Sequence, residues 1–366
     1  MLMPPFSLPT RLALFSQSLT QAKARILSDD TIDHEYLSIT GLADFTASAA
    51  KLILGAGSPA MLENRISSAQ TISGTGANHL GAVFLAKFYN FAKHGGAQEI
   101  YISNPTWANH KAIFNSVGIK PVDYPYVSGK ALTCFDHPKR RVAEAYSSAS
   151  PPLYIDQYDS KRIALDFDGF TKTLRQAKNG SVFLLHACAH NPTGVDPTKE
   201  QWSAIADIFV EKGHFAFFDC AYQGFASGDL DKDAYSVRHF VDRRSIPLLI
   251  CQSFAKNAGL YGERIGALHV VSANATEAKA VTSQLSVIQR SEISNPPAFG
   301  ARIVSLILND VTLWNQWRVD VKAMAWRIID MRQRLFEILT NELKTPGHWD
   351  HVVKQIGEYT EQALAH

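Results

Sequence analysis

The feature that most constrains the fold is an alternation of short apolar runs with helix-like segments between residues 70 and 270. The runs are rich in β-branched and aromatic residues, and each one closes on a polar turn. They are QEIYIS (98–103), SVFLLHAC (181–188), HFAFFD (214–219) and IPLLIC (246–251). Strands that are apolar on both faces and separated by helices predict an α/β fold, in which helices sandwich a mostly parallel sheet.

Two helical segments are prominent beside these strands. In GANHLGAVFLAKFYNFAKHGG the apolar residues on one helical face are Leu80, Phe84, Phe88 and Phe91. Their spacing predicts a single helix that ends at the Gly-Gly pair. Residues 310–343 carry apolar side chains three or four positions apart throughout, and they predict one long helix.

Composition and charge argue against several classes of partner. The chain has 366 residues, with 36 Lys and Arg against 34 Asp and Glu. This balance gives no electrostatic basis for binding nucleic acid or a membrane surface. The apolar runs are also far shorter than the roughly 20 residues that a membrane-spanning helix needs.

The cysteines have no metal-binding spacing. They are Cys134, Cys188, Cys220 and Cys251. Three of them lie in or beside strand-like runs, so we expect buried free thiols rather than disulfides, and no metal site. Residues 1–28 contain no Asp or Glu. We interpret them as a surface arm or first helix of a cytoplasmic protein. The alternative is a transit peptide that directs the protein to mitochondria.

Polar and aromatic residues follow each of the four strands. An open parallel sheet binds its ligands beyond the carboxyl ends of its strands, so we expect these side chains to converge at one edge. In chain order they are Trp107, His110, His190, Asn191, Asp219, Tyr222, Ser253 and Lys256.

The segment Ser73-Gly74-Thr75-Gly76 precedes the first predicted helix. Backbone N–H groups at a helix N-terminus, together with two hydroxyls, make a cradle suited to a phosphate. The next glycine is Gly81, so the spacing is not GxGxxG, and no Lys-Ser or Lys-Thr pair follows. Both observations argue against a nicotinamide dinucleotide and a nucleoside triphosphate.

One ligand would use all of these groups together, namely pyridoxal 5'-phosphate (PLP). Its aldehyde needs an amine that can lose a proton and form an imine, which a partly desolvated Lys256 can supply. Its pyridine nitrogen must stay protonated for the ring to act as an electron sink, and the Asp219 carboxylate can hold that proton. Neutral donors suit its phenolic oxygen, and Asn191 and Tyr222 are candidates. An aromatic side chain suits its ring face, and Trp107 is the candidate. A cradle with a cation suits its phosphate, and the candidates are Ser73–Gly76, Ser253 and Arg264.

Each of these residues taken singly has an ordinary structural explanation. A charge at a strand end is usually solvated, an NPTG segment is by default a turn, and Trp107 could belong to the core. The prediction of a PLP site therefore depends on their joint occurrence.

At these residues the chain resembles the class I aminotransferases of PLP fold type I, and within them the aspartate aminotransferases. The resemblance covers roughly residues 23–126 and 158–357. The matching segments are SFAKNAGLYGERIG, HACAHNPTGVDPT, FFDCAYQGFASGDLDKDAYSVRHF, NPTWANH, ISNPPAFGARIV and HEYLSITGLADF.

The resemblance implies a division into two domains. Residues 30–310 would form the large PLP-binding domain, the major domain of this fold type. Residues 1–29 with 311–366 would form a truncated small α+β domain that includes the long helix. Residues 127–157 would be a loop-like insertion, since PKRR and AYSSASPP show no sustained period.

The resemblance also implies roles for individual residues. Lys256, Asp219 and Tyr222 would be catalytic, with Lys256 as the Schiff-base lysine that moves the substrate proton. His110 would support Asp219 from behind, and His186 would lie in the same layer. The cofactor would be bound by Tyr36 of the neighbouring subunit and by Ser73, Gly74, Thr75, Trp107, His110, His186, Asn191, Asp219, Tyr222, Ser253, Lys256 and Arg264.

The substrates implied are amino acids and 2-oxo acids, bound at active sites shared between the subunits of a homodimer. Substrate contacts would come from Trp107, Asn191 and Arg290. The guanidinium of Arg290 would pair with the distal carboxylate of a dicarboxylic substrate in the neighbouring site. The activity implied is transfer of the amino group between L-aspartate and 2-oxoglutarate, giving oxaloacetate and L-glutamate.

The sequence departs from the family's pattern at several places. The Gly-rich N-terminal segment has no counterpart before Lys23, no residue matches the arginine that binds the substrate α-carboxylate, and Ile293 replaces the usual tyrosine. Loss of one bidentate carboxylate contact would cost about 2–4 kcal/mol in transition-state binding. One alternative is therefore an impaired or inactive homologue that serves as a PLP-binding or dimerisation module. Another is that the missing and inserted segments are artefacts of how the amino-acid sequence was predicted from its gene. A dehydrogenase is disfavoured by the glycine spacing.

Overall fold

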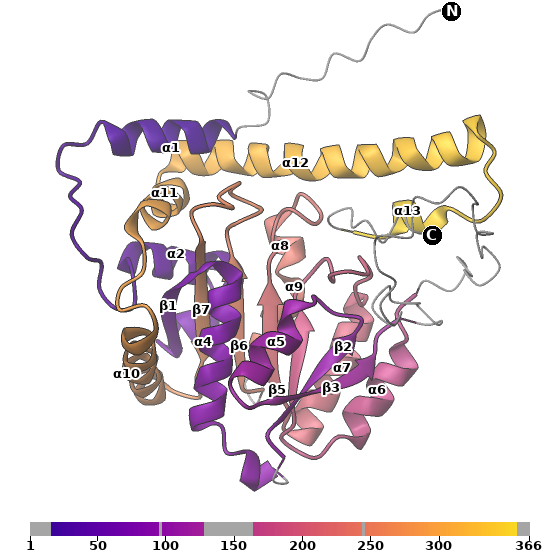
Figure 1. The fold of residues 1–366 in the computed structure, drawn as a ribbon, viewed down its shortest axis with the longest axis horizontal. Helices are drawn as coiled ribbons and strands as arrows, with labels where there is room; N and C mark the ends of the chain where they lie inside the picture. Colours follow the sequence, from indigo (N-terminus) through magenta and orange to yellow (C-terminus); the bar gives the residue numbers. More distant parts are fainter. Residues whose placement is uncertain (1–15, 95–96, 128–163, 244–245, 357–366) are drawn as a thin grey trace, which may run out of the picture.

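The computed structural model describes residues 16–94, 97–127, 164–243 and 246–356. Their centre is a seven-stranded sheet with the strand order β1-β7-β6-β5-β4-β2-β3 (Figure 1). Strands β2 to β6 pair in parallel, whereas β7 is antiparallel to both of its neighbours. The predicted fold class is confirmed. The strands are β1 (Ile66–Ile72), β2 (Glu99–Asn104), β3 (Lys120–Pro125), β4 (Val182–His186), β5 (Phe215–Cys220), β6 (Leu248–Ser253) and β7 (Ile265–Val271).

Helices cover both faces of the sheet and form a separate apolar core on each. Strand β5 shows the division, because Ala216 and Phe218 belong to one core and Phe215 and Phe217 to the other. The alternation follows from the period of two along a strand. The first core is shared with α2 (Ala43–Leu54), α6 (Phe167–Gln176), α7 (Lys199–Lys212) and α9 (Tyr235–Asp242), and the second with α4 (Ser73–Phe88), α5 (Asn109–Ser116) and α10 (Ala275–Glu292).

The predicted long helix is α12 (Val311–Glu337), which continues as a π-helical turn, η5 (Ile338–Glu342). It runs across one end of the sheet, and α1 (Gln17–Leu27) lies beside its N-terminal half (Figure 1). The Asp320 carboxylate joins the two helices, because it accepts hydrogen bonds from the hydroxyls of Ser16 at 2.6 Å and Ser18 at 2.7 Å. The start of α12 shares a third core with α1, α2 and α11 (Ala298–Asn309).

The helix predicted between residue 76 and the Gly-Gly pair differs from the prediction at both ends. Helix α4 begins at Ser73, so the SGTG segment is its first turn, and it ends at Phe88. Tyr89 has an extended backbone and its ring packs against Phe91 and Phe215, which turns the chain away from the helix axis. Phe91 consequently lies in a separate 3-10 turn, η2 (Phe91–His94).

Three of the four cysteines are described, and the prediction of buried free thiols is confirmed for Cys188, Cys220 and Cys251. Cys134 and residues 128–157 of the predicted insertion lie outside the described residues. The division into a large and a small domain stays a prediction. The remaining helices are α3 (Pro59–Leu62), α8 (Leu230–Asp233) and α13 (Asp350–Lys354).

Two features of the described residues bear on the classes of partner. None of the helices in these ranges has both the length and the apolar character that a membrane crossing requires. The same ranges contain no group of three or more His, Cys, Asp or Glu side chains arranged to hold a metal ion.

Candidate active site

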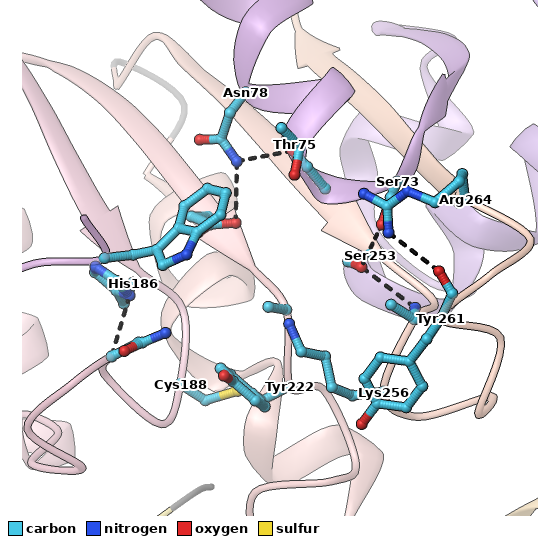
Figure 2. Close-up of a pocket in the computed structure, with 16 residues that line it drawn as sticks. Ser73, Thr75, Asn78, His186, Cys188, Tyr222, Ser253, Lys256, Tyr261 and Arg264 are labelled. Carbon is cyan, nitrogen blue, oxygen red and sulfur yellow. Dashed lines mark hydrogen bonds between the residues drawn. The ribbon is translucent and has the colours of Figure 1, made fainter. Parts of the chain in front are cut away.

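The carboxyl ends of the central strands bring the predicted site residues together. Parallel pairing places His186 opposite Asp219, and Asp219 opposite Cys251. A cavity of about 240 Å³ opens beyond these ends (Figure 2). Of the residues predicted from the sequence, its walls include Ser73, Gly74, Thr75, Trp107, His186, Asn191, Asp219, Tyr222, Ser253, Lys256 and Arg264.

The amine of Lys256 projects into this cavity from the turn after β6 (Figure 2). Its nitrogen lies 4.9 Å from the centroid of the Tyr222 ring. Two preceding residues, Phe254 and Ala255, are buried. The amine is therefore held against an aromatic face at the rim of an apolar core.

Asp219 presents a buried carboxylate to the same cavity and is 8% exposed. Burial raises the pKa of this carboxyl, but the hydrogen bond from His110 and the electrostatic attraction of the imidazole rings behind it outweigh burial, so the pKa is lowered overall. The Nε2 atom of His110 lies 3.1 Å from Oδ2 of Asp219. The amide of Asn78 donates to the other oxygen, Oδ1, at 3.3 Å. Asp219 is thus ionised at neutral pH and already faces the space that a cationic ring nitrogen would occupy.

A chain of hydrogen bonds behind Asp219 has a direction fixed at both ends. The backbone N–H of Asn191 can only donate, and it donates to Nδ1 of His186. Nε2 of His186 therefore donates to the hydroxyl of Thr106 at 3.3 Å, and that hydroxyl donates to Nδ1 of His110 at 2.8 Å. Nε2 of His110 then carries the proton that it donates to Asp219.

His186 acts in this chain as a neutral imidazole. Burial, with a smaller contribution from His110, lowers the pKa of His186 to about 3, although Asp219 opposes the shift. The ring therefore contributes hydrogen bonds and no positive charge at neutral pH. His110 itself is completely buried behind Asp219 and is not part of the cavity wall.

The first turn of α4 forms a cradle on the opposite side of the cavity. The hydroxyls of Ser73 and Ser253 lie 3.3 Å apart, and Arg264 lines the same wall (Figure 2). A Cβ atom on Gly74 would come within 3.0 Å of the Cβ atom of Ser253, so glycine keeps the cradle open. The guanidinium of Arg264 donates to the Tyr261 carbonyl at 3.2 Å, which directs it along this wall.

Hydroxyls, helix N–H groups and a guanidinium fit a phosphate dianion, and the lysine and carboxylate fit the aldehyde and ring nitrogen of one flat heterocycle. The donor set around the cavity therefore fits PLP.

Comparisons with known proteins agree with this chemistry. The chain matches the family described as aminotransferase class I and II over residues 11–364. It is 45% identical over 353 residues to the cytoplasmic aspartate aminotransferase of Saccharomyces cerevisiae, covering 95% of this chain and 75% of that protein. The chain belongs to the class I and II aminotransferases. The cytoplasmic aspartate aminotransferase of Schizosaccharomyces pombe is 44% identical, with 91% of this aminotransferase and 73% of that protein covered.

Solved structures give the same result. The structure of the Saccharomyces cerevisiae cytoplasmic enzyme superposes with a TM-score of 0.81, covering 93% of this aminotransferase and 75% of that chain. An aromatic-amino-acid aminotransferase from Burkholderia pseudomallei, covalently bound to pyridoxal phosphate, superposes with a TM-score of 0.79 at 32% identity. That superposition covers 94% of this chain and 76% of the other.

Two residues predicted for the site lie away from this cavity. Tyr36 is 85% exposed, and Arg290 donates to the Ser294 hydroxyl at 2.6 Å. Neither is among the residues that line the cavity. The family resemblance assigns both to the site of a neighbouring subunit, and this assignment stays a prediction.

Sequence reasoning missed several residues of the cavity wall. Asn78 lies four residues after Gly74, on the same face of α4, so helical spacing from the SGTG segment could have indicated it. The others are Cys188, Ala221, Ala255 and Tyr261. The first three closely follow strands β4, β5 and β6, and reading every residue beyond those strand ends would have found them.

Proposed function

We propose that this aminotransferase is an aspartate aminotransferase that uses PLP. It transfers the amino group between L-aspartate and 2-oxoglutarate, giving oxaloacetate and L-glutamate. The observation that carries the proposal is the cavity that unites the Lys256 amine, the Asp219 carboxylate and the cradle around Ser73. The names of the similar proteins from two yeasts support the choice of aspartate. The similar proteins named above are aminotransferases, which favours an enzyme over the binding-module alternative.

When bound, PLP supplies an electron sink that allows the Cα proton of the amino acid to leave. The chain's own residues hold and move the protons involved. Asp219, whose carboxylate accepts a hydrogen bond from His110, would hold the proton on the ring nitrogen. The Lys256 amine would hold the aldehyde of the cofactor, and it would accept the Cα proton and return it.

The other residues of the cavity position the ring. The Asn191 amide and the Tyr222 hydroxyl would donate to the phenolic oxygen, and Trp107 would cover one ring face. The phosphate would be held by the backbone N–H groups of Gly74 and Thr75, the hydroxyls of Ser73 and Ser253, and the guanidinium of Arg264. A ring held at both ends would keep the substrate within reach of the Lys256 amine, as proton transfer requires.

A half-reaction tests this proposal. Purified protein is loaded with PLP, and its visible absorbance band is followed after addition of L-aspartate alone. We expect the band of lysine-bound cofactor to convert to that of the amine form, with one oxaloacetate released per site. The Lys256→Ala variant should show neither change. A spectrum that L-aspartate leaves unaltered at saturating cofactor would contradict the proposed activity.

The proposed assembly is a homodimer in which Tyr36 and Arg290 each serve the partner's cavity. Support comes from the exposure of Tyr36 and from the position of Arg290 outside the cavity of its own chain. Hybrids of Lys256→Ala and Arg290→Leu chains test this arrangement, because one of the two sites in each hybrid would regain both functional residues. Hybrids no more active than either parent would contradict shared sites.

The proposed compartment is the cytoplasm, with mitochondria as the alternative. Support comes from the names of the similar yeast proteins, which are cytoplasmic. Imaging of the protein tagged at its C-terminus tests this assignment. A signal confined to mitochondria would contradict it.

A further inference from the structure

The side chain of Asn78 is a buried amide at the cofactor side of the cavity, and the roles above do not require it. It is completely buried, and its Nδ2 atom donates to the Gly74 carbonyl at 2.9 Å and to Oδ1 of Asp219 at 3.3 Å (Figure 2). Within the described residues, its own oxygen has no hydrogen-bond partner. A buried polar atom without a partner costs stability, so the amide needs an explanation.

The orientation of this amide follows from its surroundings. Exchange of its nitrogen and oxygen would place the oxygen against the Gly74 carbonyl and against the Asp219 carboxylate. Both of those groups only accept hydrogen bonds, so the exchanged arrangement would lose two bonds and gain two repulsive contacts. The NH₂ group therefore faces Asp219.

Asn78 and His110 act on different oxygens of the same carboxylate. His110 reaches Oδ2 from behind, whereas Asn78 reaches Oδ1 from the adjacent helix α4. The terminal torsion of an aspartate is broad when only one oxygen is held. Two donors on two oxygens fix the plane of the group, and they leave one lone pair on each oxygen free for a third donor.

The two donors also offset the cost of burying a charge. Burial alone would raise the pKa of Asp219, and the Asn78 bond is one of the contributions that lower it. Asn78 is an amide and stays neutral at every pH, so its contribution does not depend on the protonation of another group.

We propose that Asn78 is a positioning residue for PLP, which holds the Asp219 carboxylate in the plane and in the ionised form that keep the ring nitrogen protonated. This inference rests on the proposed PLP-dependent function. It assigns to α4 a second task beside the phosphate cradle, because the same helix then positions both the phosphate and the group that faces the ring nitrogen.

The first test compares Asn78→Leu with a matched control, Asn309→Leu. The amide of Asn309 also donates to a carbonyl four residues earlier, that of Ser305 at 2.8 Å, but it lies in α11 and does not line the cavity. Binding of PLP to the cofactor-free proteins is measured by fluorescence titration. We expect Asn78→Leu to bind PLP about 10-fold more weakly than the unmodified chain, and Asn309→Leu to bind it equally well.

The second readout is the protonation of the ring nitrogen, measured by ¹⁵N NMR of bound ¹⁵N-labelled PLP. We expect the ¹⁵N shift in Asn78→Leu to move toward that of the neutral pyridine. A packing defect alone would weaken binding without changing this shift. Unaltered affinity in Asn78→Leu, or weaker binding with an unaltered shift, would overturn the proposal.

A third variant, Asn78→Asp, keeps the shape of the side chain and covers the case in which Asn78→Leu does not fold. An ionised carboxylate at this position repels Asp219, whereas its protonated form can donate a hydrogen bond. PLP affinity of Asn78→Asp should therefore recover as pH falls, relative to the unmodified chain. A loss of affinity that is equal at all pH values would contradict the proposed role. Failure of the unmodified chain to bind PLP would instead contradict the proposed function.

Discussion

The two halves of α12 differ in their relation to the rest of the molecule. Trp317 in the first half is 1% exposed, and its indole N–H donates to the Asn257 carbonyl at 2.9 Å, next to Lys256. Trp326 and Ile329 in the second half are 56% and 40% exposed. The first half therefore supports the turn that carries the lysine, and the second half presents apolar surface.

The cofactor cavity depends on the first half of α12 and on the central strands. Strand pairing fixes His186 and Asp219, and helices on both faces hold those strands. We therefore expect substitutions near the cavity and in the first half of α12 to be costly, and substitutions of the exposed apolar side chains Trp326 and Ile329 to leave a single chain nearly unaffected.

The largest expected effect comes from a tryptophan pair on the same helix. Trp317→Ala creates a cavity in a closed core and removes a buried hydrogen bond, so the free energy of unfolding should fall by about 3–5 kcal/mol. Trp326→Ala should change it by less than about 0.5 kcal/mol. Urea denaturation of the two variants measures both values. Equal losses would show that the two halves of α12 contribute alike.

The next effect concerns the charge at the end of β5. Asp219→Asn keeps the size of the side chain but removes the negative charge that faces the ring nitrogen. We expect the rate of the half-reaction with L-aspartate to fall by about 10²–10³-fold. Stopped-flow absorbance measures this rate, and Asn309→Leu is the control. A fall of less than tenfold would contradict the role proposed for Asp219.

A smaller effect is expected at Arg290, which lies outside the cavity of its own chain. Arg290→Leu removes the proposed bidentate contact with the distal carboxylate, so kcat/KM for L-aspartate should fall by about 30- to 1000-fold. L-alanine has no distal carboxylate, and its kcat/KM should change little. Steady-state assays with both amino acids test the prediction, and equal losses for the two would remove Arg290 from substrate recognition.

The smallest expected effect is on the pH dependence of stability. Burial lowers the pKa of His269 in β7 from 6.5 to about 3, so the folded protein keeps this ring neutral. Below about pH 6.5 the unfolded chain takes up a proton that the folded one refuses, and stability is lost as the pH falls toward 3. His269→Gln should therefore lose stability less steeply over this range than the unmodified protein.

The control for this prediction is His34→Gln, because His34 is exposed. Thermal denaturation between pH 4 and pH 7 compares the slopes. A slope for His269→Gln equal to that of the control would show that the buried ring does not contribute.

Strands β2, β4, β5 and β6 were predicted from the sequence, but the edge strands β1 and β3 and the inner strand β7 were not. Strands β4, β5 and β6 are apolar on both faces, which short β-branched and aromatic runs indicate directly. Strand β1 reads ISSAQTI, and Ser67 and Gln70 are buried in it because partners far along the chain satisfy their polar groups. The Ser67 hydroxyl donates to the Ala278 carbonyl, and the Gln70 amide donates to the Pro297 carbonyl. No local pattern contains those contacts.

The same limit applies to the site. Asp219 and Lys256 could be predicted because position at or just beyond a strand end fixes where they lie relative to one another. The contact of Asn78 with Asp219 joins a helix to a strand that lies 141 positions further along the chain, so it depends on how the two elements pack. The end of α4 was missed for a similar reason, because the packing of Tyr89 against Phe215 determines it.

Chemical capture of the cofactor tests the central claim most directly. Protein loaded with PLP is treated with borohydride, which reduces the imine to a stable secondary amine, and the modified peptide is identified by mass spectrometry. We expect one phosphopyridoxyl group per chain, attached to Lys256. Attachment to any other lysine, or no attachment at saturating PLP, would contradict it.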